Sequence, residues 1–295
     1  MNYEHLKIFY TVCQYKNISK AAEALYTSQP AISRIISTIE KELKVELFFR
    51  SKEGVTLTKE GEALYKRIEY PFNELSRLDK EMPDKSKMFD EVVYLGATVT
   101  ALNCFLFDAM NEFKKKFPNV HYRIYTGSSH SILDMVRNGK IDMAFVTTPF
   151  QKYNDLKITN VYTIDNVLLC GEKYKDLANK KRRISELIKY PFILLSEEMQ
   201  FRAHIDDFLI KHNVKIIPEF EADSSSVLLP MVEKNYGLAF IPSEMAKESV
   251  ENKRAYLIEL EEEIPVRYVA MITSSIHNRS SIVRDISEYI SRISN

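Results

Sequence analysis

Hydrophobic positions in the first part of the chain recur at helical spacing. Residues 29–43 place their apolar side chains at i, i+4, i+7 and i+11, on one face of a helix, at Ile32, Ile36, Ile39 and Leu43. Similar spacing predicts helices over residues 3–15 and 18–26. Asn17 precedes the second helix and Ser28 the third, and both residue types commonly cap helix N-termini. We therefore expect three short helices around one core.

The opposite face of the helix over residues 29–43 is polar and almost uncharged. It carries Gln29, Ser33, Arg34 and Ser37, with Pro30 in its first turn. Arg34 is the only charged residue between Glu23 and Glu40, so no carboxylate interrupts this stretch. Such side chains can reach base edges and phosphates when the front of a helix enters the major groove. A solvated helix face is the alternative interpretation.

A basic hairpin follows the third helix. Residues 47–57 have the pattern of two short strands around a turn at Gly54, with Arg50 and Lys52 at its tip. Two helices, a tight turn and such a hairpin predict a winged helix-turn-helix, mostly α with a small β wing, that binds double-stranded DNA. The candidate DNA-binding residues are Ser28, Gln29, Pro30, Ser33, Arg34, Ser37, Arg50 and Lys52.

The next apolar positions follow a heptad spacing behind a capping residue, Thr58. They are Leu64, Ile68, Pro71, Leu75, Leu78 and Met82. This seam predicts a linker helix that pairs with another helix, and we expect two subunits to dimerise through Leu64, Ile68, Leu75 and Leu78. Two unrelated short helices are the alternative. Proline inside a helix costs about 3 kcal/mol, so we expect a kink or break near Tyr70.

From Glu91 onward the pattern changes to alternating strands and helices, which indicates an α/β fold. We expect strands over residues 92–97, 122–125, 143–146, 161–170, 192–195, at 220, and over 238–241 and 268–272. We expect helices over residues 100–117, 131–138, 184–188, 205–213, 227–235 and 281–293.

Hydroxyl side chains gather where these strands give way to helices. In an open parallel sheet, the carboxyl ends of the strands and the following helix N-termini face one crevice, which suits a small anion or carboxylate. Arg202 is a candidate counter-charge. Helix capping without a ligand is the alternative for each hydroxyl. The candidate effector-binding residues are Thr98, Thr100, Ser128, Ser129, Thr147, Thr148, Arg202 and Ser224.

Charge and length limit the classes of protein. The 295 residues contain 41 basic and 41 acidic side chains, which argues against nonspecific coating of nucleic acid. Residues 1–58 hold eight Lys or Arg and six Glu, so binding by one head would be weak and a dimer is expected. The chain lacks a signal peptide pattern and an apolar run of about 20 residues, so we expect a cytoplasmic protein without membrane contact.

Catalytic and metal-binding patterns are missing from the sequence. There is no nucleophile elbow or phosphate loop, and the six histidines are scattered, so we expect neither an enzyme nor a metal or cofactor site. Only His130 lies at the proposed crevice, where a surface or capping role is favoured over ligand contact. Cys13, Cys104 and Cys170 are far apart and are expected to be buried, unreactive thiols rather than a redox switch.

The N-terminal motif resembles the signature of the LysR-type transcriptional regulators. The matching residues are Ser19, Ala21–Ala22, Leu25, Ser28–Ala31, Ser33, Ile39–Glu40, Leu43, Leu47–Phe48, Arg50, Leu57–Thr58 and Gly61. Lys44 departs from it, because the family usually has glycine there. Residues 139–144 and 237–242 are similar to the family's effector domain, which has a two-lobed fold like that of periplasmic substrate-binding proteins.

The resemblance implies three parts. These are a DNA-binding domain at 1–58, a linker helix at 59–87 and an effector domain at 88–295, with lobe I at 91–161 and 268–295 and lobe II at 162–267. It implies an operator DNA, a small-molecule effector and a dimer or tetramer as partners, with RNA polymerase as a further candidate. An architectural regulator without an effector, or a binding module without a DNA role, are the alternatives.

Overall fold

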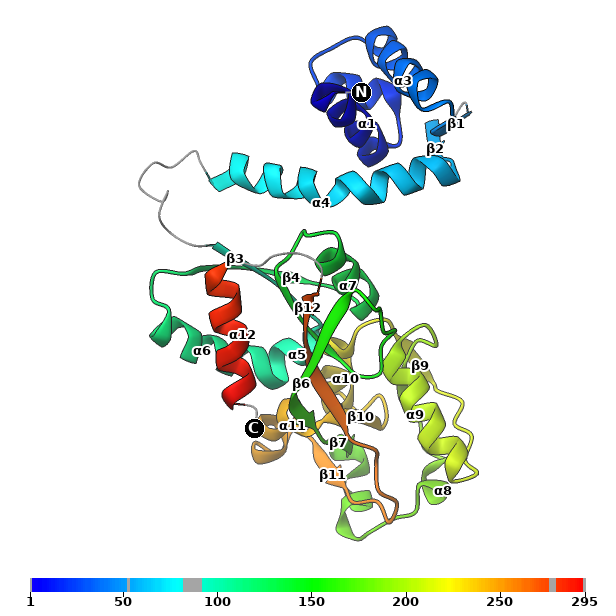
Figure 1. Cartoon of the computed structure of the whole chain (residues 1–295). Helices are drawn as coiled ribbons and strands as arrows, with labels where there is room; N and C mark the ends of the chain where they lie inside the picture. Colours follow the sequence, from blue (N-terminus) through cyan, green and yellow to red (C-terminus); the bar gives the residue numbers. More distant parts are fainter. Residues whose placement is uncertain (1, 52–53, 82–91, 276–279, 294–295) are drawn as a thin grey trace. The chain divides into compact units, whose positions relative to one another are not determined.

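The computed structural model describes residues 2–51, 54–81, 92–275 and 280–293, and for residues 77–81 and 293 it describes the backbone only. The chain divides into two compact units (Figure 1). The head unit is built from the chain before residue 90, and the two-sheet unit from almost all of the chain after it.

Three short helices form the head unit, as the apolar spacing predicted. They are α1 (Tyr3–Tyr15), α2 (Ile18–Ala24) and α3 (Gln29–Leu43). The side chains of Asn2, Asn17 and Ser28 each accept a hydrogen bond from a backbone N–H in the first turn of the helix that follows. Ile32, Ile36 and Ile39 are fully buried, but Leu43 is 39% exposed and lies outside the core. The predicted helix to residue 26 ends earlier, because Tyr26 has a positive φ of 51°.

The wing is a two-stranded antiparallel hairpin of β1 (Phe48–Ser51) and β2 (Gly54–Leu57). Thr58 follows it and accepts a hydrogen bond from the Gly61 N–H at 3.0 Å, so it caps the next helix as expected. A side chain at Gly61 would begin 2.2 Å from the Leu47 carbonyl oxygen. Only glycine therefore allows this helix to start so close to the wing.

The long helix α4 (Lys59–Glu81) is continuous. It passes through Pro71 without interruption, so of the two outcomes expected near Tyr70 the break is wrong, and the kink stays a prediction. Its first half packs on the head of its own chain: Ile68 and Phe72 are buried in the head core, and Leu64 is packed against that core. Leu64 and Ile68, which were expected to contact a second subunit, are therefore covered by the head of their own chain. A heptad spacing gives a helix an apolar stripe, but does not specify which chain covers it.

Aromatic rings join α1 to α4. The rings of Tyr3, Phe72, Tyr10 and Tyr65 stack in that order, with centroids 5.5, 4.9 and 5.8 Å apart and interplanar angles of 11–16°. The Tyr10 hydroxyl donates a hydrogen bond to the Asn73 side chain at 2.9 Å. These contacts fix the start of the long helix to the head.

The first sheet of the two-sheet unit has five strands in the order β4-β3-β5-β12-β6. The first three are parallel, and β12 runs antiparallel to β5 and β6. The strands are β3 (Val92–Ala97), β4 (His121–Thr126), β5 (Met143–Thr147), β6 (Leu156–Ile164) and β12 (Arg267–Ser274).

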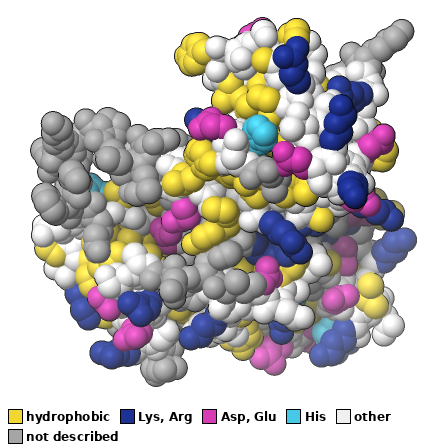
Figure 2. Space-filling view, turned by 45° about the horizontal axis from the view of Figure 1, so that its top comes forward, with side chains coloured by type: hydrophobic (Ala, Val, Ile, Leu, Met, Phe, Trp, Pro, Cys, Tyr) yellow, Lys and Arg dark blue, Asp and Glu magenta, His cyan; other side chains and the backbone are white. Residues whose placement is uncertain are grey.

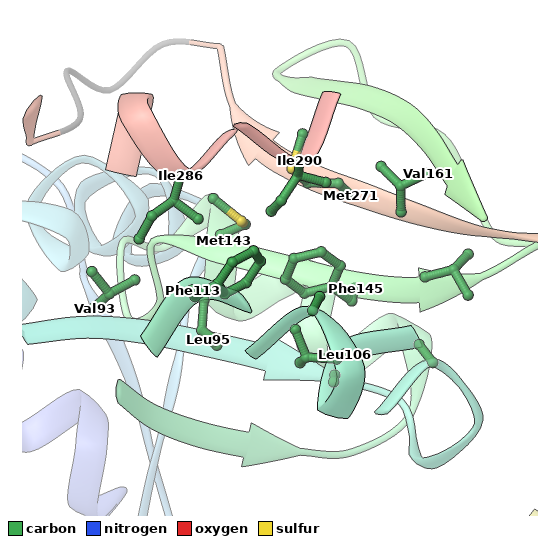
Figure 3. Packing of buried hydrophobic residues seen from close by; sticks show 14 of the residues in the cluster. Val93, Leu95, Leu106, Phe113, Met143, Phe145, Val161, Met271, Ile286 and Ile290 are labelled. Atoms are coloured by element: carbon green, nitrogen blue, oxygen red, sulfur yellow. The ribbon is translucent and has the colours of Figure 1, made fainter. Parts of the chain in front are cut away.

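Helices cover both faces of this sheet. One face is covered by α12 (Ser281–Ile293) and by a second helical stretch. This stretch consists of α5 (Val99–Ala101), a π-helical turn (Leu102–Leu106) and α6 (Phe107–Lys116). Phe113 and Phe145 lie in that core with Ile286 and Ile290 (Figure 3). Helix α7 (Ser129–Arg137) contributes to a second core, shared with Tyr94, Ala144 and Ala270. The fully buried β5 has the burial expected of a strand covered on both faces.

The chain leaves the first sheet at Asp165 and returns to it at Arg267. Between these points, three antiparallel strands form the second sheet, in the order β10-β7-β11, and a parallel pair β8-β9 is linked to it by a bridge between Phe192 and Leu238. These strands are β7 (Asn166–Cys170), β8 (Ile193–Leu195), β9 (Phe220–Ala222), β10 (Ala239–Pro242) and β11 (Tyr256–Ile258). The helices are α8 (Ile184–Leu187), α9 (Gln200–Lys211), α10 (Leu228–Glu233) and α11 (Ser243–Glu251), with 3-10 turns at Glu172–Asn179 and Ser225–Val227.

Candidate functional site

Helix α3 presents the predicted polar face to the surface of the head unit. Gln29 donates a hydrogen bond to the Ser33 hydroxyl at 3.0 Å, which holds these two side chains together. Arg34 is exposed, and its guanidinium forms no hydrogen bond or ion pair within the described part of the chain. Ser28, Pro30 and Ser37 lie on the same helix or at its start, so six of the predicted residues share one surface.

The wing differs from its prediction. Arg50 lies within β1, opposite Val55, rather than at the tip. Its guanidinium is 3.6 Å from the carboxylate of Glu40, and the other oxygen of that carboxylate accepts a hydrogen bond from the Leu47 N–H. Arg50 is therefore partly neutralised and held against α3. The predicted contact Lys52 lies outside the described residues.

Two exposed aromatic side chains of the head were not predicted. Tyr26, in the turn between α2 and α3, is 99% exposed, and Phe49 of the wing is 59% exposed. Tyr26 was expected to be the last residue of the helix predicted over residues 18–26. The signal that could have found it is its position immediately before Thr27 and the Ser28 cap, where the chain must turn.

A cavity of about 490 Å³ opens in the two-sheet unit. It lies where strands β3, β4, β5, β8 and β9 end and the following helices or turns begin. This is the crevice that the strand and helix pattern predicted. Seven of the eight predicted effector residues line it, namely Thr98, Thr100, Ser128, Ser129, Thr147, Thr148 and Ser224.

Several of these hydroxyls also have structural partners. The oxygens of Thr98, Ser128 and Ser224 accept hydrogen bonds from the backbone N–H groups of Ala101, Ser131 and Ser226, at 3.3, 3.2 and 3.4 Å. They therefore cap their helices, which was the alternative to ligand contact. Across the cavity, the Thr100 and Ser225 hydroxyls are 3.3 Å apart, so the segments of the two sheets meet here.

Arg202 is not the counter-charge of the cavity. It is buried, its Nε is 3.0 Å from Asp206, and its Nη1 donates hydrogen bonds to Glu221 at 2.7 Å and to the Leu195 carbonyl at 2.8 Å. Although burial lowers its pKa, the bonds to Glu221 and Asp206 outweigh this and raise the pKa above the ordinary value. Its charge is thus compensated within the protein, so the prediction for Arg202 is wrong.

Arg267 lines the cavity instead. It is 2% exposed, its guanidinium lies 3.7 Å from the Phe201 ring centroid, and Nη2 donates to the Asn166 side chain at 3.1 Å. Its Nε has no hydrogen-bond partner, and no carboxylate in the described part of the chain lies within ion-pair distance. Burial lowers the pKa of Arg267 to about 10, although the Glu244 carboxylate, beyond ion-pair distance, acts in the opposite direction, so Arg267 remains charged at neutral pH.

The sequence offered only a weak signal for Arg267. A single arginine precedes the mostly apolar run of residues 268–272, where the chain returns to the first sheet. The pattern predicted the return but not the role of the charge. His130 also lines the cavity; it is 3.4 Å from Asp134 and its side chain is 71% exposed, as a surface histidine would be.

The described residues give little support for metal binding, thiol chemistry or a membrane-spanning helix. They contain no group of three or more His, Cys, Asp or Glu side chains that could hold a metal ion. Cys104 and Cys170 are buried, and burial raises the pKa of each thiol to about 12, which makes them unreactive. No described helix combines the length and apolar character that crossing a membrane requires. Acidic and basic side chains are mixed over the face shown in Figure 2.

Comparison with known proteins assigns both units. Residues 3–62 match the family described as bacterial regulatory helix-turn-helix protein, lysR family, and residues 89–293 match the LysR substrate binding domain. The transcriptional regulator YofA of Bacillus velezensis is 27% identical over 273 residues, which cover 92% of this chain and 91% of YofA.

Solved structures share the fold. Full-length CbnR, a LysR family regulator, in complex with its target DNA has a TM-score of 0.70 at 16% identity, and the match covers both chains completely. The effector binding domain of QuiR in complex with shikimate has a TM-score of 0.61 at 16% identity, covering 68% of this chain and 95% of that domain.

Proposed function

Because this chain belongs to the LysR family of bacterial transcriptional regulators, we propose that the cavity of its two-sheet unit binds a small carboxylate effector. The chain is a DNA-binding regulator with an effector-binding domain, and its relatives are regulators rather than enzymes. The proposal concerns the chemistry of the effector and the residues that bind it.

The observation that carries the proposal is the environment of Arg267. A buried charge costs free energy unless an opposite charge or hydrogen bonds compensate it. Within the described residues this guanidinium has one amide and one aromatic ring as direct neighbours and an unpaired Nε, and the Glu244 carboxylate acts on it only from beyond ion-pair distance. Arg202, in contrast, has three carboxylates within 3.9 Å. A ligand carboxylate would supply the missing charge through strong charge-assisted hydrogen bonds.

The rest of the cavity wall is also suited to an anion. The helical stretch that begins at Val99 and helix α7 both start at the cavity, behind Thr98 and Ser128. Helix N-termini carry partial positive charge and favour anions. Apolar side chains, including Leu133, Phe150 and Met199, complete the wall, so the effector should have an apolar part as well. QuiR, whose effector domain shares the fold, was solved with shikimate, a carboxylate.

We further propose that the exposed face of α3 reads DNA. Ser28, Gln29, Pro30, Ser33, Arg34 and Ser37 would face the major groove, and Arg50 and Lys52 of the wing would contact the backbone. Gln29 and Arg34 are the side chains best suited to base edges. Support comes from their shared surface and from the Arg34 side chain, which has no partner among the residues that the structure describes.

An effector can alter DNA binding only if it prefers one arrangement of the protein. The cavity lies between segments that belong to the two sheets, which contact each other through Thr100 and Ser225. A ligand bound there would contact both segments and favour the arrangement in which they are close. The difference between the ligand's binding free energies for the two arrangements is the free energy available for regulation.

Titration calorimetry with a panel of small carboxylates tests the effector proposal. We expect at least one to bind the full-length protein, and Arg267→Gln to weaken it by tenfold or more, which is about 1.4 kcal/mol. Arg183→Gln is a matched control, because Arg183 is exposed and does not line the cavity. Arg267→Lys tests whether charge alone suffices. Equal carboxylate binding by wild type and a folded Arg267→Gln variant would show that the proposal is wrong.

A further inference from the structure

The cavity wall also contains two carboxylates. Glu198 follows β8 and Asp223 follows β9, and both residues line the cavity. Strands β8 and β9 are parallel neighbours in which Leu195 pairs with Ala222, so the two loops leave the sheet side by side. Glu198 and Asp223 therefore belong to neighbouring loops at the same side of the cavity.

Neither carboxylate has a partner in the described part of the chain. Nearby acidic residues differ in this respect: Asp206 and Glu221 pair with Arg202, and Glu197 lies 3.9 Å from the same guanidinium. Because Arg202 is fully occupied by these groups, it does not neutralise Glu198 or Asp223. The cavity wall thus carries two exposed carboxylates that no cation in the described part of the chain neutralises, and a cationic ligand group could bind them in place of water.

The positive features belong to other segments. Arg267 begins β12, and the two helix N-termini at the cavity follow β3 and β4, so all three come from the part of the chain that forms the first sheet. Glu198 and Asp223 come from the part between the two crossings. Arg267 is nine-tenths or more buried, and its unpaired Nε leaves a donor at this wall that a ligand carboxylate would satisfy.

We propose that the effector is dipolar, with a carboxylate bound by Arg267 and an ammonium group bound by Glu198 and Asp223, as in an α-amino acid. This inference rests on the proposed function, because it assumes that Arg267 receives the carboxylate. A cavity of about 490 Å³ is of the size that holds a small molecule. An effector with only negative charge would face two uncompensated carboxylates, whereas a dipolar effector matches both walls.

This assignment also explains how binding can be coupled to conformation. The two charged ends of one ligand would contact segments from different sheets, so the ligand would connect them. A carboxylate without an ammonium group would contact mainly one segment and would favour the close arrangement less.

Matched ligand pairs test the inference. We would titrate the full-length protein by calorimetry with the common L-amino acids and with the carboxylate that lacks the amino group of each, for example L-alanine with propionate and L-glutamate with glutarate. We expect at least one amino acid to bind tenfold or more tightly than its partner. The Glu198→Gln/Asp223→Asn double variant should reduce that ratio to about threefold or less, whereas Glu197→Gln, at a carboxylate outside the cavity lining, should leave it unchanged.

The possible failures are distinguishable. If a carboxylate without an amino group binds as tightly as its amino acid and binding is lost in Arg267→Gln, the dipolar effector is refuted while the carboxylate site stands. If the amino acid preference persists in the double variant, the ammonium group binds elsewhere and the assignment of Glu198 and Asp223 is wrong. If Arg267→Gln leaves all carboxylate binding intact, the proposed function itself fails.

Discussion

Two buried arginines in the two-sheet unit have opposite environments. Arg202 is surrounded by carboxylates within 3.0 Å, whereas Arg267 has an amide, an aromatic ring and an unpaired Nε. A charge that is already compensated has little free energy to gain from a ligand, while an uncompensated one has much. This difference assigns Arg202 a structural role and makes Arg267 the candidate ligand contact.

Arg34 provides a test of DNA reading. We expect Arg34→Ala to weaken binding to the specific operator by about 1 to 3 kcal/mol and to weaken binding to random DNA much less, because a base contact carries sequence information. Lys7→Ala, at an exposed residue of α1, is the control. Fluorescence anisotropy with both duplexes measures the effect. An equal loss on the two duplexes would make Arg34 a phosphate contact.

Lys44 provides a test of backbone strain. It follows α3 with a φ of 56°, in the left-handed region, where the family usually has glycine. We expect Lys44→Gly to stabilise the protein by about 1 kcal/mol, because a side chain is unfavourable in this conformation. Lys41→Gly, within the last turn of the helix, should destabilise it by a similar amount. Denaturant unfolding measures both, and a destabilising Lys44→Gly would show that its side chain makes a compensating contact.

At the scale of elements, one part of helix α4 packs on the head and another part is exposed. Its first half is fixed to the head by Ile68, Phe72 and the ring stack, while Leu75, further along, is 41% exposed. Leu75 therefore remains a candidate for contact with a second subunit, and the side chain of Leu78 lies outside the described residues. If two copies of α4 pair, movement of one helix against the other would be transmitted to the heads, because the ring stack fixes each α4 to its head.

Substitutions along α4 should separate these roles. We expect Ile68→Ala to lower the free energy of unfolding by about 2 to 5 kcal/mol, because it creates a cavity in the head core. Leu75→Asp should instead shift the oligomer toward monomer in sedimentation experiments and leave the thermal stability of the head nearly unchanged. Lys66→Ala is an exposed control on the same helix. A Leu75→Asp protein that remains fully dimeric would place the dimer contact elsewhere.

The sequence predicted the bounds of helices and strands better than it predicted which residues pack or pair with one another. The bounds of α1, α3 and α12 match the apolar spacing, since each of these helices has a strong periodic pattern, and β3 matches because it is a continuous apolar run. The π-helical turn at Leu102–Leu106 was missed, because its residues continue a helical pattern. Helix α11 and strand β11 were missed because the first is largely polar and the second has only three residues.

At the scale of the whole molecule, the sequence located the cavity but misassigned its charge. The hydroxyls lie at predictable strand ends, so seven of them could be identified from local pattern alone. The roles of Arg202 and Arg267 depend on which residues the fold brings beside them from distant parts of the chain. Spacing along the sequence does not contain that information, and the same limit explains the error over Leu64 and Ile68.

The central claim is that a carboxylate bound by Arg267 changes which part of the operator DNA this regulator contacts. The most direct measurement is a footprint of the full-length protein on an operator selected from genomic fragments, with and without each carboxylate of the panel. We predict that one carboxylate changes the wild-type footprint and has no effect on the footprint of a folded, DNA-binding Arg267→Gln variant. The same change in both proteins would contradict the account, as would a wild-type footprint that no carboxylate alters.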